Sequence, residues 1–215
     1  MDLTPDLLLK AYACGLFPMA ESAQSKDVFW VEPNKRGIIP LSDVHVPRRL
    51  KKTIRQVPFD VRVDTAFKRV MELCAETTTI RRETWINDQI VALYTRLFDI
   101  GQAHSIECWD GTELVGGLYG VRLAGAFFGE SMFHRATDAS KIALIYLIAR
   151  LKAGGFSLLD TQFITDHLSQ FGAREIDREA YQELLAQALQ KQAYFYQLPV
   201  DAAPDVVLQS VTQRS

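Results

Sequence analysis

Three polar side chains stand in stretches of the chain that otherwise have the composition of buried β-strands: Glu130, Asp160 and Gln162. Asp160 and Gln162 are two positions apart, so a strand places both side chains on one face. A charge buried without a partner is costly, so such residues either have a partner or take part in function. The other interpretation is that Glu130 and Asp160 end their strands and face solvent, or pair with Lys141 or Arg135. The residues alone leave both interpretations open.

The elements that would position these residues run from Ala103 to Gln162. Asp110-Gly111 predicts a hairpin, because this pair tolerates the positive φ that tight turns need. Asp138 is expected to cap a helix that ends at Gly154-Gly155. The predicted order is strand, strand, strand, helix, strand, over residues 103–109, 113–123, 126–133, 139–153 and 156–162. A mixed sheet with a helix after its third strand predicts an α/β (α+β) fold with acetyltransferase-like topology.

The most basic stretch of the chain lies between residues 46 and 55, with no acidic residue among its cations. Pro47 in a first turn and the spacing of Leu50 and Ile54 predict a short helix with one apolar stripe. A solvated helix face is the alternative, but such faces usually mix charge signs. The pattern therefore favours a phosphate-binding patch made of Arg48, Arg49, Lys51, Lys52 and Arg55. Lys68, Arg69, Arg81 and Arg82 are candidates to extend it.

Aromatic and methionine side chains surround the polar residues. Most of them are expected to be core, but Trp30 and Trp85 lie beside predicted loops, where an indole can stack on a base. The complete set is Met19, Trp30, Trp85, Phe127, Phe128, Met132 and Phe133.

Composition restricts the class of protein. The 215 residues are 48% hydrophobic and 23% charged, which is typical of a globular domain. The net charge of −2 argues against bulk nucleic-acid coating. The three cysteines are widely spaced and include no CxxC pair, so we expect neither a disulfide framework nor a zinc site. The expected compartment is a reducing cytoplasm. No signal peptide or apolar run of membrane-spanning length is visible, so we expect no membrane association.

Several common catalytic motifs are absent from the sequence. No GxxxxGK[ST] or GxGxxG opens a helix, and there is no GxSxG elbow. The four histidines lack metal-ligand spacing, so structural roles are expected for them. The remaining candidates for chemistry are two carboxylates and an amide on adjacent strands, the aromatic residues around them, and a basic helix.

Taken together, the motifs closely resemble those of the bacterial leucyl/phenylalanyl-tRNA–protein transferases. The resemblance runs from about Ala11 to Arg178, and its most specific part is GESMF followed by D-x-Q-x-x-T-D-H-L at this spacing. The matching segments are AYACGLFPM (11–19), the block from Trp30 to RGIIPL (30–41), HVPRRLKK (45–52), ETWIN (83–87), GQAHSIECW (101–109), ELVGGLYGV (113–121), FFGESMF (127–133), ASKIALIYL (139–147), LLDTQFITDHL (158–168) and GAREIDR (172–178).

This resemblance implies a cytoplasmic enzyme that takes Leu or Phe, sometimes Met, from aminoacyl-tRNA. The acceptor is the α-amino group of proteins that begin with Arg or Lys. The product is an N-degron read by the ClpS adaptor and the ClpAP protease, and no metal or dissociable cofactor is used. The implied organisation is a small N-terminal domain over residues 1–36 and an acetyltransferase-like catalytic domain over residues 37–199. We expect a mobile polar tail over residues 200–215.

The resemblance also implies roles for individual residues. Asp160 and Gln162 match the pair that orients and polarises the acceptor amine, with Asp160 acting through Gln162 and not as a strong base. Glu130 matches the acid that faces the acceptor's cationic N-terminal residue. Phe127 and Met132 are expected to line the pocket for the donor side chain. Trp85 and Tyr12 match stacking positions for the terminal adenosine, and the helix with Arg48 to Arg55 is expected to hold acceptor-stem phosphates.

Two departures from the family pattern bear on the site. Thr161 stands where the family usually has Cys, and Met19 occupies a position that is Trp in some members. Neither departure touches Glu130, Asp160 or Gln162, so we expect activity to be retained.

Two other functions are compatible with parts of the pattern. An acetyl-CoA-dependent amine acetyltransferase would share the fold, but its R/Q-x-x-G-x-G/A loop is absent. A non-catalytic tRNA-binding module would need the basic helix but not Asp160 or Gln162. We also expect a monomer, because the predicted elements leave no spare apolar stripe.

Overall fold

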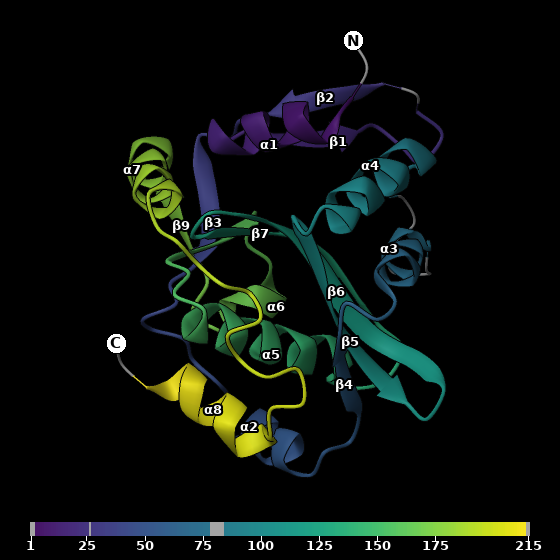
Figure 1. Ribbon diagram of the computed structural model, residues 1–215, viewed down its shortest axis with the longest axis vertical. Coiled ribbons are helices and arrows are strands. Elements are labelled where there is room, and N and C mark those ends of the chain that lie inside the picture. The colour runs from purple at the N-terminus through teal and green to yellow at the C-terminus, as the bar shows by residue number, and fades with distance from the viewer. Residues whose placement is uncertain (1–2, 26, 78–83, 214–215) are drawn as a thin grey trace.

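The computed structural model describes residues 3–25, 27–77 and 84–213, and its centre is a seven-stranded mixed sheet with the strand order β4-β5-β6-β7-β8-β3-β9 (Figure 1). The strands of this sheet are β3 (Lys35–Ile39), β4 (Asp60–Val63), β5 (Ala103–Asp110), β6 (Glu113–Leu123), β7 (Ala126–His134), β8 (Leu158–Gln162) and β9 (Arg174–Asp177). A separate two-stranded sheet contains β1 (Phe17–Ala20) and β2 (Val28–Val31).

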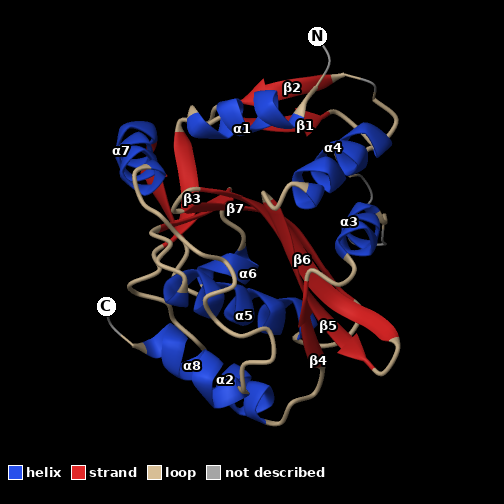
Figure 2. Ribbon diagram, in the orientation of Figure 1, coloured by secondary structure: helices blue, strands red, loops and turns tan. Residues whose placement is uncertain are grey.

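Helices cover both faces of the large sheet (Figure 2). One face packs against α5 (Ala139–Ala153), which is buried around most of its circumference because α2 (Arg48–Arg55) and α8 (Pro204–Thr212) cover its other side. The other face packs against α1 (Pro5–Ala13), α3 (Phe67–Ala75), α4 (Asp88–Asp99) and α7 (Arg178–Leu189). A four-residue helix, α6 (Asp166–Ser169), follows β8. The core is therefore divided into two apolar clusters by the sheet.

The central part of the sheet confirms the mixed α/β prediction. Strands β5, β6 and β7 form an antiparallel meander, and α5 then returns the chain so that β8 runs parallel to β7. The first turn differs by one residue from the expected Asp110-Gly111, because Asp110 pairs with Glu113 and the turn residues are Gly111 and Thr112. Gly111 has the positive φ, of 58°, that the turn requires.

Strands β7 and β8 are paired only at their beginnings. Ala126, Phe127 and Phe128 pair with residues 158–160, and the pairing stops at Asp160. Beyond that point the sheet is open between the two strands. Gly129 to Met132 on one side and Thr161 and Gln162 on the other line the resulting space. This division between paired and unpaired halves creates the candidate site.

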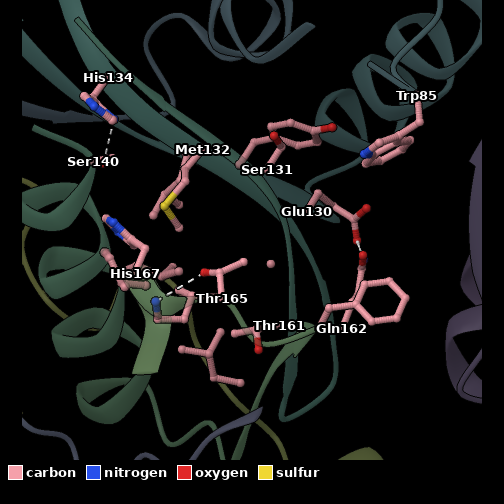
Figure 3. A pocket seen from close by; sticks show the side chains of 18 of the residues that line it. Trp85, Glu130, Ser131, Met132, His134, Ser140, Thr161, Gln162, Thr165 and His167 are labelled. Carbon is pink, nitrogen blue, oxygen red and sulfur yellow. Dashed lines mark hydrogen bonds between the residues drawn. The ribbon is translucent and has the colours of Figure 1, made fainter. Parts of the chain in front are cut away.

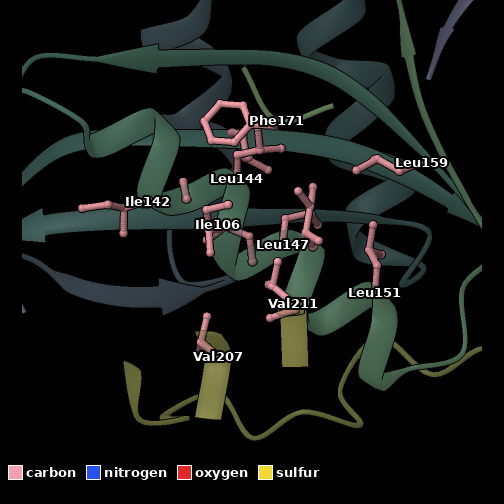
Figure 4. Close-up of a cluster of buried hydrophobic side chains, with 14 of the residues drawn as sticks. Ile106, Ile142, Leu144, Leu147, Leu151, Leu159, Phe171, Val207 and Val211 are labelled. Carbon is pink, nitrogen blue, oxygen red and sulfur yellow. The ribbon is translucent and has the colours of Figure 1, made fainter. Parts of the chain in front are cut away.

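The expected mobile tail is wrong for most of its length, because α8 is a packed helix. Val207, Leu208 and Val211 are buried, and Figure 4 shows Val207 and Val211 beneath the α5 residues Leu147 and Leu151. Pro204 opens the helix, where its missing N–H is not needed. The spacing of the three apolar residues is that of one helix face.

The N-terminal region also differs in part from expectation. Phe17 is fully buried in strand β1. Strand β3 spans the proposed boundary at residue 36 and belongs to the large sheet, and the domain division itself stays a prediction. Within the described residues, the helices are too short or too polar to cross a membrane.

Candidate active site

A cavity of about 410 Å³ opens where β7 and β8 separate (Figure 3). Trp85, Glu130 and Gln162 lie at one end of it, and Met132 lies between them and His134, Ser140 and His167 at the other end. The apolar wall between the two ends consists of Leu118, Met132, Leu144, Leu147, Leu159 and Leu168. Polar side chains thus lie at both ends of an apolar wall, and the end with Glu130, Gln162 and the exposed Phe163 is called the mouth below.

Glu130 enters this cavity because of an irregularity in strand β7. The register between β6 and β7 shifts so that Tyr119 faces Ser131 while Gly120 faces Gly129, which leaves Glu130 as the extra residue of a β-bulge. A bulge re-aims the side chain of the unpaired residue. Gly120 also has no room for a side chain, since a Cβ there would lie 2.3 Å from the carbonyl oxygen of Phe128. The local backbone thus directs Glu130 out of the regular strand alternation.

Three donors from three elements hold the Glu130 carboxylate. Tyr12 of α1 donates its hydroxyl to Oε1 at 2.6 Å, and Tyr94 of α4 donates to Oε2 at 3.1 Å. Gln162 donates its side-chain amide to Oε1 at 3.0 Å. Burial raises the pKa of the Glu130 carboxyl to about 7, although these three hydrogen bonds lower it and the nearby charge of Asp160 raises it. Glu130 therefore titrates near neutral pH at the wall of the cavity.

Asp160 is bound on all sides and does not line the cavity. Arg36 of β3 donates to both of its oxygens, with Nη2 at 2.7 Å from Oδ2, and neither side chain is more than 2% exposed. Tyr181 of α7 donates to Oδ2 at 2.6 Å, and the backbone N–H of Gln162 donates to Oδ1 at 2.7 Å. The alternative that the two acids pair with Lys141 or Arg135 is wrong, because those cations pair with Asp138 and Glu76, respectively.

Gln162 connects the two acidic groups through a strained turn. Its φ is +62°, and the N–H of Phe163 donates to the carbonyl of Thr161 at 2.7 Å, which is the hydrogen-bond pattern of a γ-turn. A non-glycine residue at positive φ is costly and persists only where its surroundings fix it. Here the Asp160 carboxylate holds the Gln162 backbone, and the Gln162 side chain reaches Glu130.

The predicted donor-pocket and stacking residues are only partly brought together. Met132 and Trp85 line the cavity as expected. Phe127 does not, because the paired part of β7 directs it into the cluster under α5, where it stacks on Phe195 at 5.8 Å. Tyr12 is fully buried beneath Glu130 and has no exposed ring face for a base. Trp30, on strand β2, is 37% exposed but is not among the residues that line the cavity.

Phe163 is a site residue that the sequence analysis did not select. It lines the cavity beside Gln162 and is 46% exposed. Its ring meets the edge of the buried Phe17 at 5.7 Å, and its backbone is so close to Gly37 that a Cβ there would lie 2.8 Å away. The signal in the sequence was an aromatic residue directly after the polar pair.

The basic helix is present as predicted. Leu50 and Ile54 of α2 are buried, which turns the cations outward, and Arg55 pairs with the exposed Asp205 of α8. The backbone N–H of His45, shortly before α2, donates to Phe171, shortly after α6. The helix thus begins near α6, which contributes His167 and Leu168 to the lining of the cavity. Of the suggested extension, Arg69 pairs with Glu72, while Arg81 and Arg82 lie outside the described residues.

This arrangement suits the transfer of an activated group to an amine. The cavity offers an apolar wall, an amide and one carboxylate, and the described residues contain no group of three or more metal-ligating side chains. The Ser140 hydroxyl lies 3.4 Å from Nδ1 of His134, which is longer than the usual distance in a nucleophile–base pair. Positioning, electrostatics and proton transfer to a carboxylate are catalytic means that such a lining can supply.

Comparison with known proteins gives consistent matches over most of the chain. A model of the leucyl/phenylalanyl-tRNA protein transferase family matches residues 38–186, and a model of that family's N-terminal domain matches residues 1–34. A leucyl/phenylalanyl-tRNA–protein transferase of Paramagnetospirillum magneticum is 59% identical over 90% of this chain and 92% of its own length. Those of Afipia carboxidovorans and Phenylobacterium zucineum are 56% and 54% identical over 93% and 97% of this chain, and 88% and 96% of their own lengths.

Among solved structures, a mutant of a cAMP-binding acyltransferase from Mycobacterium smegmatis aligns with 97% of this chain and 60% of its own chain. The TM-score is 0.30 and the identity is 11%, so this alignment supports no conclusion about the site.

Proposed function

Because the chain belongs to the leucyl/phenylalanyl-tRNA–protein transferase family and is an aminoacyltransferase, we propose that its acceptors are proteins that begin with Arg or Lys. The observation that carries this proposal is the placement of Glu130. It is the one carboxylate among the described residues that line the cavity, and it lies at the mouth beside Gln162. A carboxylate in a partly desolvated site favours cationic side chains over neutral ones.

The apolar wall of the cavity supports Leu and Phe as the donor side chains. Leu144 and Leu147 of α5, Met132 of β7 and Leu159 of β8 all line the cavity. Methionine is flexible and polarizable, so it adapts to both branched and aromatic groups. A β-branched or polar side chain would fit this wall less well, and we propose Met as a third donor.

The ester that links donor to tRNA is already activated, so the site needs to position the acceptor amine and stabilise the oxyanion that forms. Gln162 is suited to orient the amine, because its backbone is fixed by Asp160 and its side chain by Glu130. Asp160 then acts as a positioning residue, consistent with a role exerted through Gln162.

The tRNA would approach from the mouth of the cavity. With the donor side chain inside, the terminal adenosine must lie just outside, where Trp85 and Phe163 offer aromatic faces. Stacking on such faces accepts any base. The outward cations of α2 would hold backbone phosphates, which gives affinity without sequence selection.

The biological consequence we propose is an N-terminal Leu or Phe that marks the acceptor for the ClpS adaptor and the ClpAP protease in the cytoplasm. A monomer suffices for this chemistry, since every group named above belongs to a single chain.

The direct test is transfer of labelled Phe or Leu from charged tRNA to peptides that differ only in their first residue. We expect product with Arg and Lys peptides and little with Ala or Asp peptides. Met132→Trp should fill the cavity and lower transfer at least tenfold, whereas Phe29→Ala, a change to an exposed aromatic of β2, should not. Equal transfer to the Ala peptide would contradict the acceptor assignment. Binding of tRNA without any transfer would contradict the enzymatic function.

A further inference from the structure

The two acidic residues of the site differ in what can reach them. We propose that Glu130, and not Asp160, is the catalytic residue that takes the proton from the acceptor's α-ammonium group. This inference rests on the proposed function, because it presumes that an N-terminal amine enters the cavity.

Asp160 has no capacity left for this task. Its two oxygens accept from Nε and Nη2 of Arg36, the hydroxyl of Tyr181 and the backbone N–H of Gln162. Its side chain is 0% exposed and it does not line the cavity. A proton delivered to Asp160 would have to displace the buried Arg36 guanidinium, which also stacks on Phe17 and Tyr181 at 4.4 and 4.6 Å.

Glu130 has capacity left and lies where the amine must come. Oε1 accepts from Tyr12 and Gln162, but Oε2 accepts only the longer hydrogen bond from Tyr94 among the described residues. Gln162 holds the carboxylate at the mouth of the cavity, on the same side as Trp85 (Figure 3). An amine bound against Gln162 would therefore be within reach of Oε2.

The step balances without a further reactant. The α-ammonium gives one proton to Glu130 and becomes a neutral amine, whose nitrogen lone pair attacks the ester carbonyl carbon. The bond from that carbon to the ribose oxygen then breaks, and the leaving oxygen takes the second proton that the nitrogen loses as the amide forms. Glu130 finally releases its proton to water, so one proton leaves the site for each turnover.

The proton affinities of the two groups are matched. An N-terminal amine has a pKa of about 7.7–8.0, while an ordinary glutamate, at about 4.3, would accept its proton only with difficulty. Burial raises the pKa of Glu130 to about 7. Charged and titratable groups face it from several sides: Tyr12 on α1, Tyr94 on α4, and Asp160 and Arg36 behind Gln162. The two tyrosine hydroxyls stay protonated at neutral pH, because burial raises their pKa well above the ordinary value.

The test is the pH dependence of kcat/KM for transfer to an Arg peptide, in the intact protein and in Glu130→Gln. With the pKa of Glu130 at about 7 and of the amine at about 8, the intact protein should peak near pH 7.5, with rates at pH 6.5 and 8.5 equal to within about twofold. Glu130→Gln can use only the fraction of the amine that is already deprotonated in solution. Its rate should fall about 20-fold from pH 8.5 to 6.5. Samples without enzyme correct for hydrolysis of the ester.

A second variant keeps the test independent of how well Glu130→Gln folds. Tyr94→Phe removes one hydrogen bond that lowers the pKa of Glu130, so the acidic limb of the profile should move to higher pH while the amine limb stays. Tyr196→Phe, at an exposed tyrosine away from the cavity, should leave the profile unchanged.

Each other outcome overturns the proposal. A Glu130→Gln enzyme with the profile of the intact protein but a higher KM for Arg peptides would limit Glu130 to side-chain recognition. An unmoved acidic limb in Tyr94→Phe would assign that limb to another group. If the intact protein transfers at no pH, the proposed function fails and this inference fails with it, whereas transfer with unaltered profiles overturns this inference alone.

Discussion

Asp160 and Glu130 are both acidic residues on neighbouring parallel strands, yet the molecule treats them in opposite ways. Asp160 is the last residue of β8 that pairs with β7, and it is sealed by Arg36 and Tyr181. Glu130 lies on β7, two residues beyond the last residue that pairs with β8, and borders the cavity. The point at which the strands separate thus decides which carboxylate supports the fold and which is available to a substrate.

The largest expected effect is a loss of stability in Asp160→Asn. The variant leaves the Arg36 guanidinium buried without its partner, and breaking a buried pair costs about 3–5 kcal/mol. Urea unfolding at pH 7 would measure this. Asp205→Asn is the matched control, because it removes the partner of Arg55 in an exposed pair and should cost less than about 1 kcal/mol. Equal costs would show that Asp160 is not a structural anchor.

The next effect is a change with pH in the stability of Glu130→Gln relative to the intact protein. The pKa of Glu130 is raised by folding, so its contribution to stability is present at low pH and is lost as pH rises through about 7. Glu130→Gln has no such loss. The unfolding free energy of the variant relative to the intact protein should therefore increase by about 2–3 kcal/mol between pH 5 and pH 8. A difference that stays constant over this range would mean that Glu130 is not buried as described.

A third change tests the cavity mouth beside Glu130. Phe163→Ala removes an exposed ring at the cavity mouth, and stacking on a base is worth about 1–3 kcal/mol. The KM for aminoacyl-tRNA should rise about 5- to 150-fold while the KM for the peptide and the unfolding midpoint stay close to those of the intact protein. Phe29→Ala, at a similarly exposed ring on β2, is the control. A rise in the peptide KM instead would place Phe163 on the acceptor side.

The smallest effect concerns cations on the outside of the molecule, in contrast to the sealed Arg36. Arg49→Ala on α2 should weaken tRNA binding several-fold and lower the slope of log K against log salt by up to about one. Arg62→Ala, whose guanidinium pairs with Asp60 on β4, should change neither quantity. An unchanged salt slope in Arg49→Ala would move the phosphate contacts elsewhere.

The sequence predicts the parts of this site that depend on local pattern. Glu130, Asp160 and Gln162 were selected because they are polar residues in apolar strands. The predicted order of elements from Ala103 onward placed them on a mixed sheet. Their partners could not be predicted, because Tyr12 and Arg36 meet Glu130 and Asp160 across more than 100 positions of the chain.

Local geometry accounts for the other differences. The bulge at Glu130 and the turn at Gln162 depend on close contacts at Gly120 and Gly37 that only the folded chain creates. Phe127 was expected in the pocket from the resemblance, but it lies in the part of β7 that pairs with β8, and the sequence does not show where that pairing ends.

The most direct test of the account is to measure transfer to an Arg peptide at pH 6.5 and 8.5 by Glu130→Gln and Asp160→Asn, with each rate divided by the folded fraction. The account predicts that folded Asp160→Asn keeps nearly equal rates at the two values, as the intact protein does, while Glu130→Gln falls about 20-fold at the lower pH. The reverse pattern, with the fall in Asp160→Asn and nearly equal rates in Glu130→Gln, would contradict it and assign the proton to Asp160.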